Sequence, residues 1–423
     1  MLGVYQCSAN LSNNDKFVAD TTEEFKKDKK EDKADRNDMI QQKLLEENTI
    51  KTILDEKVRV LIMNQGYQGI YHAELSIVCN EGIIVDRNGK LLEYPPDSEI
   101  TFTNKDFEEN QPICIVGKNE GRLQIKNINR NCSAQYRGKL ECYAVPEGIV
   151  VINELLVEEY LYSVVPSEMP STYPEEALKA QAISARTYTY FHKKSYAYPE
   201  WKAHMDDSTA FQVYMNCEER PSAVRAVDET KNQVLTYKGE IVESFYYSTS
   251  SGYNGGASVW NDSPSAADAY LIETGEEIYA TGSTEGEQRY QMFIENGNET
   301  DIEYNDAWYR WDYDRTLDKN GVKELLQNLY QLSRTQPQKI RIRSRFLSSD
   351  QIKNEEAIQD IRILSRKKSG MVAGIMIETE HFRVSVMSQH LIRQALGCAK
   401  DTITRNDGSS LSLIHISEPT RPY

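Results

Sequence analysis

Residues 160–192 read YLYSVVPSEMPSTYPEEALKAQAISARTYTYFH, and this stretch determines how the rest of the chain is interpreted. Small and polar residues recur in it at spacings that a purely apolar core does not require. Pro166 and Pro170 bracket the tripeptide Ser-Glu-Met, and the residue before a proline is disfavoured in helical geometry. We therefore expect Glu168 to lie on a stiff connection between two helices.

The segment before this connection has the pattern of an amphipathic helix. Leu156, Tyr160 and Val164 recur every four residues, and Asn153 is a suitable N-cap residue. The pattern predicts a helix from Asn153 to Val165.

The second helix is expected to begin at Pro174, because a proline lacks the N–H that is unpaired in a first turn anyway. Its residues are small, so the helix can approach other backbone closely. One stripe consists of Leu178, Ala182, Ala185 and Thr189, and another of Gln181, Ser184 and Tyr188. Two interpretations remain open: a well-packed core helix with satisfied polar groups, or a helix that lines a cleft with Glu168 at its entrance.

Two runs in this region, VVPSEMP at 164–170 and YPEEALKAQAISARTY at 173–188, closely resemble the signature of the stage II sporulation protein D (SpoIID/LytB) family. Shorter similarities continue downstream and become weak at 392–397, so the resemblance covers most of the chain between Val58 and Gly397. Members of this family act on bacterial peptidoglycan. The resemblance implies lytic transglycosylase activity and places its acid/base group on the glutamate of the Ser-Glu-Met motif, which is Glu168 here.

The expected chemistry explains why one carboxyl group can suffice. Cleavage of a glycosidic bond needs a proton for the leaving oxygen, and a dry pocket can raise the pKa of a carboxyl group enough for this task at neutral pH. A hydrolase needs a second carboxylate, for which Asp206, Asp207 and Asp228 are the candidates. Asp207 begins an Asp-Ser-Thr turn, and such a side chain more often bonds local backbone N–H groups. In a lytic transglycosylase the C6 hydroxyl of N-acetylmuramic acid is the nucleophile instead, and the product is a 1,6-anhydro end.

Polar side chains around the signature are the candidate substrate-binding groups. Arg186 can bind a carboxylate or an acetamido group through two hydrogen bonds, but a salt bridge to a glutamate of the neighbouring helix is an equally good interpretation. The hydroxyl-rich residues 248–252 follow an expected strand and suit the lip of a sugar cleft. The candidates are Gln181, Ser184, Arg186, Tyr188, Gln212, Tyr214, Tyr247, Ser248 and Ser250.

The resemblance also raises the question of a metal. Family members reported to hold zinc have cysteines near the Asp-Ser-Thr and Gln-Val-Tyr motifs, and many have a histidine before the Ser-Thr-Ser run. This chain has Asp206, Phe211 and Tyr247 at those positions. His204 and Cys217 are nearby, but two such groups do not complete a tetrahedral zinc site. We therefore expect no metal ion and no other cofactor.

The seven cysteines are scattered and show neither CxxC nor metal-type spacing. Cys132 and Cys142 form one possible disulfide across an expected hairpin, provided that the protein is exported. Buried free thiols are the favoured interpretation.

Composition restricts the partners of the protein. The chain has 423 residues, a formal net charge of −16 and a pI near 5.0. Such a charge disfavours nucleic acid and anionic membrane faces, and it would also repel teichoic acids. Binding to glycan strands must therefore depend on hydrogen bonds and stacking, for which the 26 tyrosines are suited.

The two ends are not expected to belong to the folded part. Residues 1–52 have the composition of a charged flexible spacer, with a mixed-charge run and no apolar face at 26–38. Neither a signal peptide nor a membrane-spanning stretch is apparent, and we expect a native N-terminal anchor to be missing. The run LSLIHISEPTR at 411–421 resembles a translated sequencing adapter, so 411–423 are interpreted as an artefact and 401–410 as a truncated end.

Residues 53–400 are predicted to form the catalytic domain, with a mainly β part at 53–150, the signature helices and cleft at 151–270, and an α+β part at 271–400. A hairpin is expected from 133–136 to 140–143. Strands outnumber helices without regular βαβ alternation, so the predicted class is α+β with a mixed, largely antiparallel sheet core and a central slim helix pair.

The leading functional prediction is an extracytoplasmic, membrane-anchored lytic transglycosylase. It would cleave the bond between N-acetylmuramic acid and N-acetylglucosamine in peptide-stripped glycan strands, with a cell-wall amidase as its working partner. The alternative belongs to another class of protein, a non-catalytic glycan-binding module that enhances an amidase.

Overall fold

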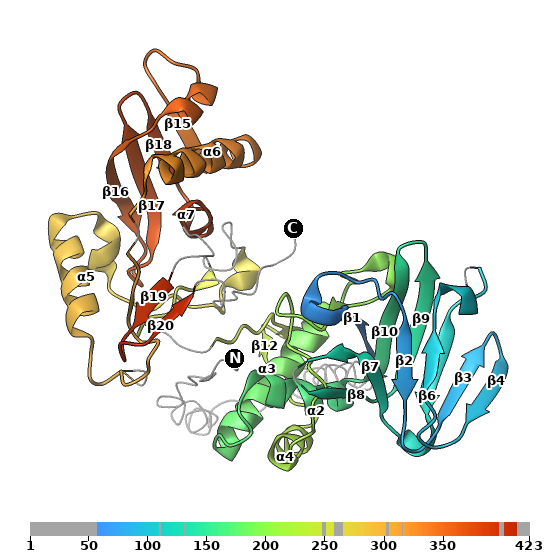
Figure 1. Ribbon diagram of the computed structural model, residues 1–423. Coiled ribbons are helices and arrows are strands. Elements are labelled where there is room, and N and C mark those ends of the chain that lie inside the picture. The colour runs from blue at the N-terminus through green and yellow to red at the C-terminus, as the bar shows by residue number, and fades with distance from the viewer. Residues whose placement is uncertain are drawn as a thin grey trace, which may run out of the picture. The chain divides into compact units, whose positions relative to one another are not determined.

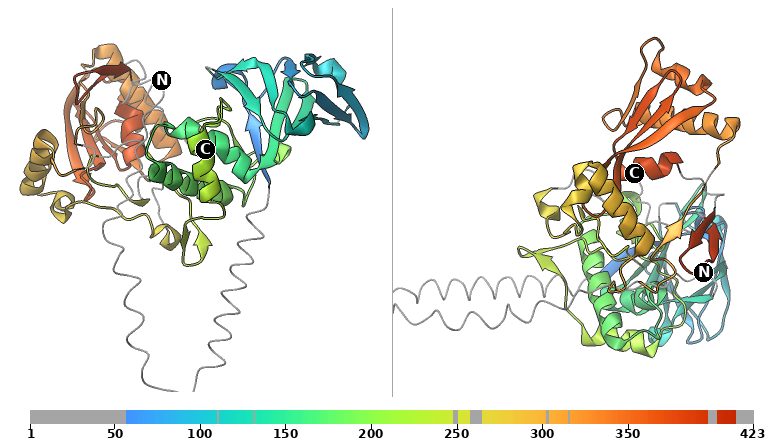
Figure 2. Two further views of the ribbon diagram at one scale, coloured as in Figure 1. Left: turned by 90° about the horizontal axis from the view of Figure 1, so that it is seen from below. Right: turned by 90° about the vertical axis from the view of Figure 1, so that its left-hand side faces the viewer.

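The chain folds into two compact units, with the boundary between Ser248 and Thr249 (Figures 1 and 2). The computed structural model describes residues 57–109, 111–130, 132–247, 251–257, 265–301, 304–314, 316–396 and 402–412. They form helices and mostly antiparallel sheets, which confirms the predicted α+β class. None of the helices within these ranges combines the length and the apolar content needed to cross a bilayer.

The first unit contains a seven-stranded sheet, ordered β11-β1-β10-β9-β6-β3-β4, and a four-stranded sheet, ordered β5-β2-β7-β8. The larger sheet is antiparallel except where β1 pairs with β11. The bounds of its strands are β1 Lys57–Ile62, β3 Ile83–Arg87, β4 Lys90–Tyr94, β6 Ile113–Gly117, β9 Lys139–Val145, β10 Gly148–Leu156 and β11 Met205–Asp206. Those of the smaller sheet are β2 Leu75–Val78, β5 Ile100–Phe102, β7 Leu123–Asn129 and β8 Ser133–Tyr136.

Alternating side chains of the two sheets share one apolar core. Val58, Val60 and Ile62 of β1 are buried in the same cluster as Leu75 and Ile77 of β2. Residues at i and i+2 of a strand point to the same face, so each strand contributes one apolar row to the core.

The predicted hairpin at 133–143 is wrong, although both of its strands exist. β8 pairs with β7 in the smaller sheet, whereas β9 pairs with β10 and β6 in the larger one. The chain changes sheets at Gly138, which has a φ of +70°. A Cβ atom there would lie 2.4 Å from the carbonyl oxygen of Glu154, so only glycine fits this crossing.

Helices α2 (Val157–Glu168), α3 (Glu175–His192) and α4 (Pro221–Glu229) pack against one another beside these sheets (Figures 1 and 2). The stripe of Leu178, Ala182, Ala185 and Thr189 on α3 is fully buried. The small residues of α3 therefore serve close helix packing. A short hairpin follows, in which β12 (Thr236–Tyr237) and β13 (Glu240–Ile241) are joined by two residues of positive φ.

The predicted start of the first signature helix is also wrong. Asn153 lies within β10, and α2 begins at Val157. The side-chain amide of Asn153 donates hydrogen bonds to the carbonyl groups of Arg137 and Lys139, 2.8 and 3.2 Å away. Buried strand residues on both sides of Asn153 override the helical spacing, because propensity yields to tertiary packing.

The second unit has its own core beneath a four-stranded sheet ordered β15-β18-β17-β16. Helices α6 and α7 cover one face of this sheet, and a three-stranded sheet, β14-β19-β20, lies apart from it. The bounds are α5 Thr284–Asn296, β14 Trp311–Asp312, α6 Lys319–Thr335, β15 Ile340–Arg343, β16 Ile358–Arg366, β17 Val372–Thr379, β18 Arg383–Val386, α7 Gln389–Leu396, β19 Thr402–Arg405 and β20 Ser410–Ser412.

The division into units differs from the predicted one, in which residues 53–400 form one domain and 151–270 one part of it. The described residues after 250 bond within the second unit. Ala257 N–H donates to the carbonyl of Leu271, and Arg310 donates to the carbonyl of Ser251. The expected spacer at 1–52 and residues 413–423 lie outside the described residues, whereas 411 and 412 lie in β20.

A disulfide joins Cys132 to Cys217, with their Cα atoms 5.7 Å apart. The pairing of Cys132 with Cys142 is therefore wrong, since Cys142 is a buried free thiol of β9 in the other sheet. The bond closes a separation of 85 residues and ties the β8 side of the smaller sheet to the segment that follows Tyr214.

Replacing Cys132 and Cys217 together by serine is expected to lower the free energy of unfolding by about 2–4 kcal/mol, since the bond restricts the unfolded chain. Urea titrations of the oxidised parent and the double variant measure the difference. Cys114→Ser, which removes a half-buried free thiol, is the control. Equal midpoints for the parent and the double variant would contradict the prediction.

Candidate active site

Glu168 is the last residue of α2 and is only 4% exposed. The prediction that it follows the helix on a separate connection is wrong, because α2 continues through Pro166. The apolar residues Val164, Val165 and Met169 are buried around this last turn and hold it against the core. The N–H of Met169 still donates to the carbonyl of Val165 at 2.9 Å, so the helix ends one turn after the proline.

The polar face at the end of α2 binds the backbone of the segment 213–216. Val213 N–H donates to Oε1 of Glu168 at 2.7 Å, Met215 N–H to Oγ of Ser167 at 3.3 Å, and Asn216 N–H to Oγ of Ser163 at 2.9 Å. The carboxyl group is thereby fixed in position by a residue distant in sequence.

Tyr246 provides the second contact to this carboxyl group. The side-chain amide of Gln212 donates to the Tyr246 oxygen at 3.1 Å, and the Tyr246 hydroxyl hydrogen bonds Glu168. Burial raises the pKa of Tyr246, so its hydroxyl stays protonated and can donate. Tyr246 is not predicted as a site residue from the sequence, because two adjacent tyrosines on an extended segment give no sign of which one points inward.

Burial raises the pKa of Glu168 to about 7, although the hydrogen bonds from Val213 and Tyr246 favour the ionised form. Desolvation penalises a charged carboxylate more than two donors compensate. The group is therefore distributed between its acid and its base form near neutral pH, as a general acid/base catalyst requires.

Gln212 and Tyr214, which were candidates for glycan binding, are fully buried. The Gln212 amide nitrogen lies 3.2 Å from the carbonyl of Ala185, and the Tyr214 hydroxyl donates to Asn153 at 2.8 Å. These side chains hold the segment that positions Glu168 and do not face a ligand.

Arg186 is also fully buried and forms the salt bridge that was one of its two interpretations. Its Nε and Nη2 donate to the two carboxylate oxygens of Glu158 on α2, at 2.8 and 2.7 Å. The carbonyl groups of Val227 and Gln233 accept its other donors. Arg186 therefore joins α2, α3 and the end of α4 from inside.

The remaining candidate substrate-binding residues differ from one another in burial and in contacts. Gln181 is 1% exposed, and its amide nitrogen has no hydrogen-bond partner among the described residues. The ring of Tyr188 lies 4.2 Å from that of His192 between centroids, and Tyr247 is 39% exposed. Ser184 accepts a hydrogen bond from Ser244 at its carbonyl. Ser248 and Ser250 lie outside the described residues.

The candidate second carboxylates are engaged elsewhere. Asp207 forms a buried salt bridge with Arg130 at 2.8 Å and accepts the N–H of Met63. The local turn that the sequence assigned to Asp207 belongs to Asp206, which accepts Ser208 N–H at 2.7 Å. Asp228 accepts the hydroxyl of Tyr162.

Two residues considered as metal ligands have other partners. Cys217 is in the disulfide, and Nδ1 of His204 accepts the backbone N–H of Arg59 at 3.1 Å. Burial lowers the pKa of His204 to about 4, so the imidazole is neutral and can accept this bond. In the described part of the chain, no three His, Cys, Asp or Glu side chains are grouped as a metal site.

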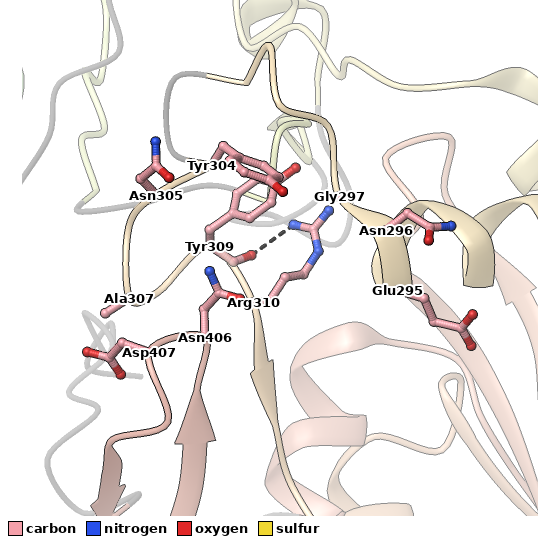
Figure 3. Close-up of a pocket in the computed structure, with 10 residues that line it drawn as sticks. All are labelled: Glu295, Asn296, Gly297, Tyr304, Asn305, Ala307, Tyr309, Arg310, Asn406 and Asp407. Atoms are coloured by element: carbon pink, nitrogen blue, oxygen red, sulfur yellow. Dashed lines mark hydrogen bonds between the residues drawn. The ribbon is translucent and has the colours of Figure 1, made fainter.

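A cavity of about 310 Å³ lies in the second unit, away from these residues in sequence (Figure 3). Its cationic side chain, Arg310, donates to the carbonyl groups of Phe293, Ile294 and Tyr309, and Tyr309 donates to Asp301. These hydrogen bonds stabilise the end of α5, and they leave few polar atoms of Arg310 and Tyr309 available to a ligand.

Comparison with known proteins agrees with the position of this site. Residues 146–237 match the family model described as stage II sporulation protein. An uncharacterized protein of Brachyspira hyodysenteriae is 35% identical over 126 residues, which are 29% of this chain and 33% of that protein. The amidase enhancer of Bacillus subtilis is 39% identical over 104 residues, 24% of this chain and 14% of the enhancer.

Stage II sporulation protein D of Bacillus subtilis is 34% identical over 123 residues, 26% of this chain and 36% of that protein. The similarity therefore covers at most 36% of the length of these relatives. The match to the family model lies in the part of the first unit that contains β10, α2, α3 and α4. This part, which carries Glu168, is similar to stage II sporulation protein D.

Proposed function

We propose that the protein is a lytic transglycosylase that cleaves the bond between N-acetylmuramic acid and N-acetylglucosamine in peptidoglycan, with Glu168 as its general acid/base. One observation carries the proposal: a buried carboxyl group with a pKa of about 7 is held between a backbone N–H and a tyrosine hydroxyl. This is the state in which one group can both give and take a proton at neutral pH.

In the proposed reaction, protonated Glu168 gives its proton to the glycosidic oxygen while the bond from that oxygen to C1 of the muramic sugar breaks. The C6 hydroxyl of the same sugar forms the new bond to C1, and its proton passes to the Glu168 carboxylate. The catalyst is restored, no water is consumed, and the products are a 1,6-anhydro end and a free O4 hydroxyl on N-acetylglucosamine.

The engagement of the nearby aspartates supports this route over hydrolysis. A hydrolase needs a second carboxylate that activates water or attacks the sugar. Asp207 is neutralised by Arg130, and Asp206 accepts the Tyr198 hydroxyl as well as Ser208 N–H. With these carboxylates occupied, the internal hydroxyl of the substrate is the available nucleophile.

The disulfide supports an extracytoplasmic location, because such bonds persist in oxidising compartments. Glycan strands outside the cell are then accessible to the protein. Strands from which stem peptides have been removed are the proposed substrate, and a cell-wall amidase is the proposed partner.

A second candidate function is favoured by the relative named amidase enhancer, which is 39% identical over its matched residues. In that case the first unit would bind glycan without cleaving it and would stimulate an amidase. The two candidates differ in whether the protein itself cleaves glycan through the Glu168 carboxyl group.

Mass analysis of the soluble products from amidase-treated peptidoglycan tests the proposal. Transglycosylation gives muramic ends that lack one water relative to hydrolysis and that have no reducing group. Reducing muramic ends would indicate hydrolysis, and the absence of new ends together with faster amidase activity would indicate an enhancer.

The rate of cleavage is expected to fall as the pH rises through about 7, since only the protonated form of Glu168 can donate to the leaving oxygen. Initial rates of anhydro-end formation between pH 5 and 9 measure this limb. Circular dichroism across the same range controls for unfolding. A rate that stays constant from pH 6 to 8 would contradict the proposed role of Glu168.

A further inference from the structure

Strand β15 carries arginines at alternate positions on one face of the second unit's sheet. Ile340 and Ile342 pair with Val386 and Val384, whose side chains belong to the core beneath α6 and α7. Because side chains alternate along a strand, Arg341 and Arg343 project from the opposite face. Both arginines are exposed, as is Arg345 just beyond the strand.

The charges of these three arginines are not compensated. None of the three guanidinium groups has a hydrogen bond or an ion pair with another described residue. The acidic residue Glu378 on the same face is already paired with Arg362 and Arg383. No acidic residue occurs between Glu324 and Asp350, in a chain whose formal net charge is −16.

An exposed aromatic residue follows the arginines directly. Phe346 is 89% exposed and Leu347 is 36% exposed. The Ser344 hydroxyl accepts the N–H groups of both residues, at 3.3 and 3.2 Å, so the turn that presents them is hydrogen bonded. Transfer of such large apolar side chains from water into an apolar environment is favourable.

We propose that this surface, the basic edge formed by Arg341, Arg343, Arg345, Phe346 and Leu347, binds the anionic face of a lipid bilayer. Guanidinium groups bind lipid phosphates through paired hydrogen bonds, and residues two apart in a strand are about 6.8 Å apart. Phe346 and Leu347 enter the boundary between headgroups and acyl chains.

Two features distinguish a bilayer from a soluble polyanion. A phosphate polymer would use the arginines but would leave Phe346 in water. The remainder of the acidic chain is repelled by an anionic surface, so binding depends on this edge and decreases as salt screens the charges. The proposal does not depend on glycan cleavage, and Glu168→Gln is expected to bind lipid as the parent does.

Co-sedimentation of the full chain with vesicles tests the proposal, using phosphatidylcholine alone and phosphatidylcholine with about 30% phosphatidylglycerol. We expect binding to the anionic vesicles only, and release at about 0.5 M salt. The triple variant R341Q/R343Q/R345Q is expected to bind on the order of 100-fold more weakly, from about five-fold per cationic side chain. Phe346→Ser is expected to weaken binding to vesicles several-fold.

The matched control is R225Q/R289Q/R334Q, which removes the same net charge from exposed positions elsewhere. An equal loss of vesicle binding in this control would overturn the proposal, because the overall charge of the protein would then explain the binding. Absence of binding by the parent would also overturn it. If polyphosphate competed fully and Phe346→Ser had no effect, the surface would bind a polyanion and not a bilayer. Thermal unfolding of each variant verifies that it is folded.

Discussion

Glutamine at position 168 is expected to reduce glycan cleavage by at least about 10²–10⁴-fold while leaving the first unit folded. The amide oxygen of glutamine can still accept the N–H of Val213, so the segment 213–216 stays in place. The amide cannot donate a proton to the leaving oxygen. Quantifying anhydro ends released from amidase-treated peptidoglycan measures the loss.

Glu176→Gln is the matched control, because it makes the same chemical change at an exposed position of α3. It is expected to cleave as the parent does. If Glu168→Gln retained parental activity, the assignment of the acid/base would be wrong. If neither the parent nor Glu168→Gln cleaved glycan but both stimulated an amidase, the enhancer function would replace the proposed one.

Stability gives an independent check on the environment of Glu168. Its pKa rises from an ordinary value of 4.5 to about 7 on folding, so the folded state binds the proton more tightly than the unfolded state does. The free energy of unfolding therefore falls as the pH rises from about 4.5 to 7. Glu168→Gln removes this penalty and should be more stable than the parent at pH 8, which links the catalytic group to a cost in stability.

Replacing Arg186 by methionine is expected to destabilise the first unit by about 3–5 kcal/mol. Methionine approximates the length of the side chain but leaves the Glu158 carboxylate without its partner, together with two backbone carbonyl groups. Urea unfolding measures the change. A loss of glycan binding without a loss of stability would instead mean that Arg186 contacts substrate.

Two further variants separate the buried pair from charge in general. Glu158→Gln/Arg186→Met should recover part of the loss, because no unpaired charge remains. Lys179→Met removes a partly exposed cation of the same helix, whose ion pairs are with solvent-accessible glutamates, and should change the unfolding midpoint far less. Equal effects of Arg186→Met and Lys179→Met would contradict the structural role of Arg186.

The sequence by itself determined the elements whose signal is local. Helix α3 begins at Glu175, directly after Pro174, where the proline predicts the start of the second helix. The family resemblance of the Ser-Glu-Met motif identifies Glu168 as the candidate acid/base, and this role stays a prediction. Such features depend on residues that are close together in the sequence.

The tertiary structure alone decided what lies next to what. Cys132 finds Cys217 across 85 residues, and β8 and β9 enter different sheets although they are adjacent in sequence. Strand pairing and disulfide pairing are non-local, and no spacing rule specifies the partner.

Burial also separated structural from functional polar residues. Arg186, Gln212 and Tyr214 resemble ligand-binding groups in the sequence, yet each one is saturated inside the first unit. Tyr246 gave no signal, although it hydrogen bonds Glu168. A polar side chain has the same sequence signature whether it faces a ligand or a buried partner. Only the packing that removes water from Glu168 raises its pKa, and that packing is built from distant segments.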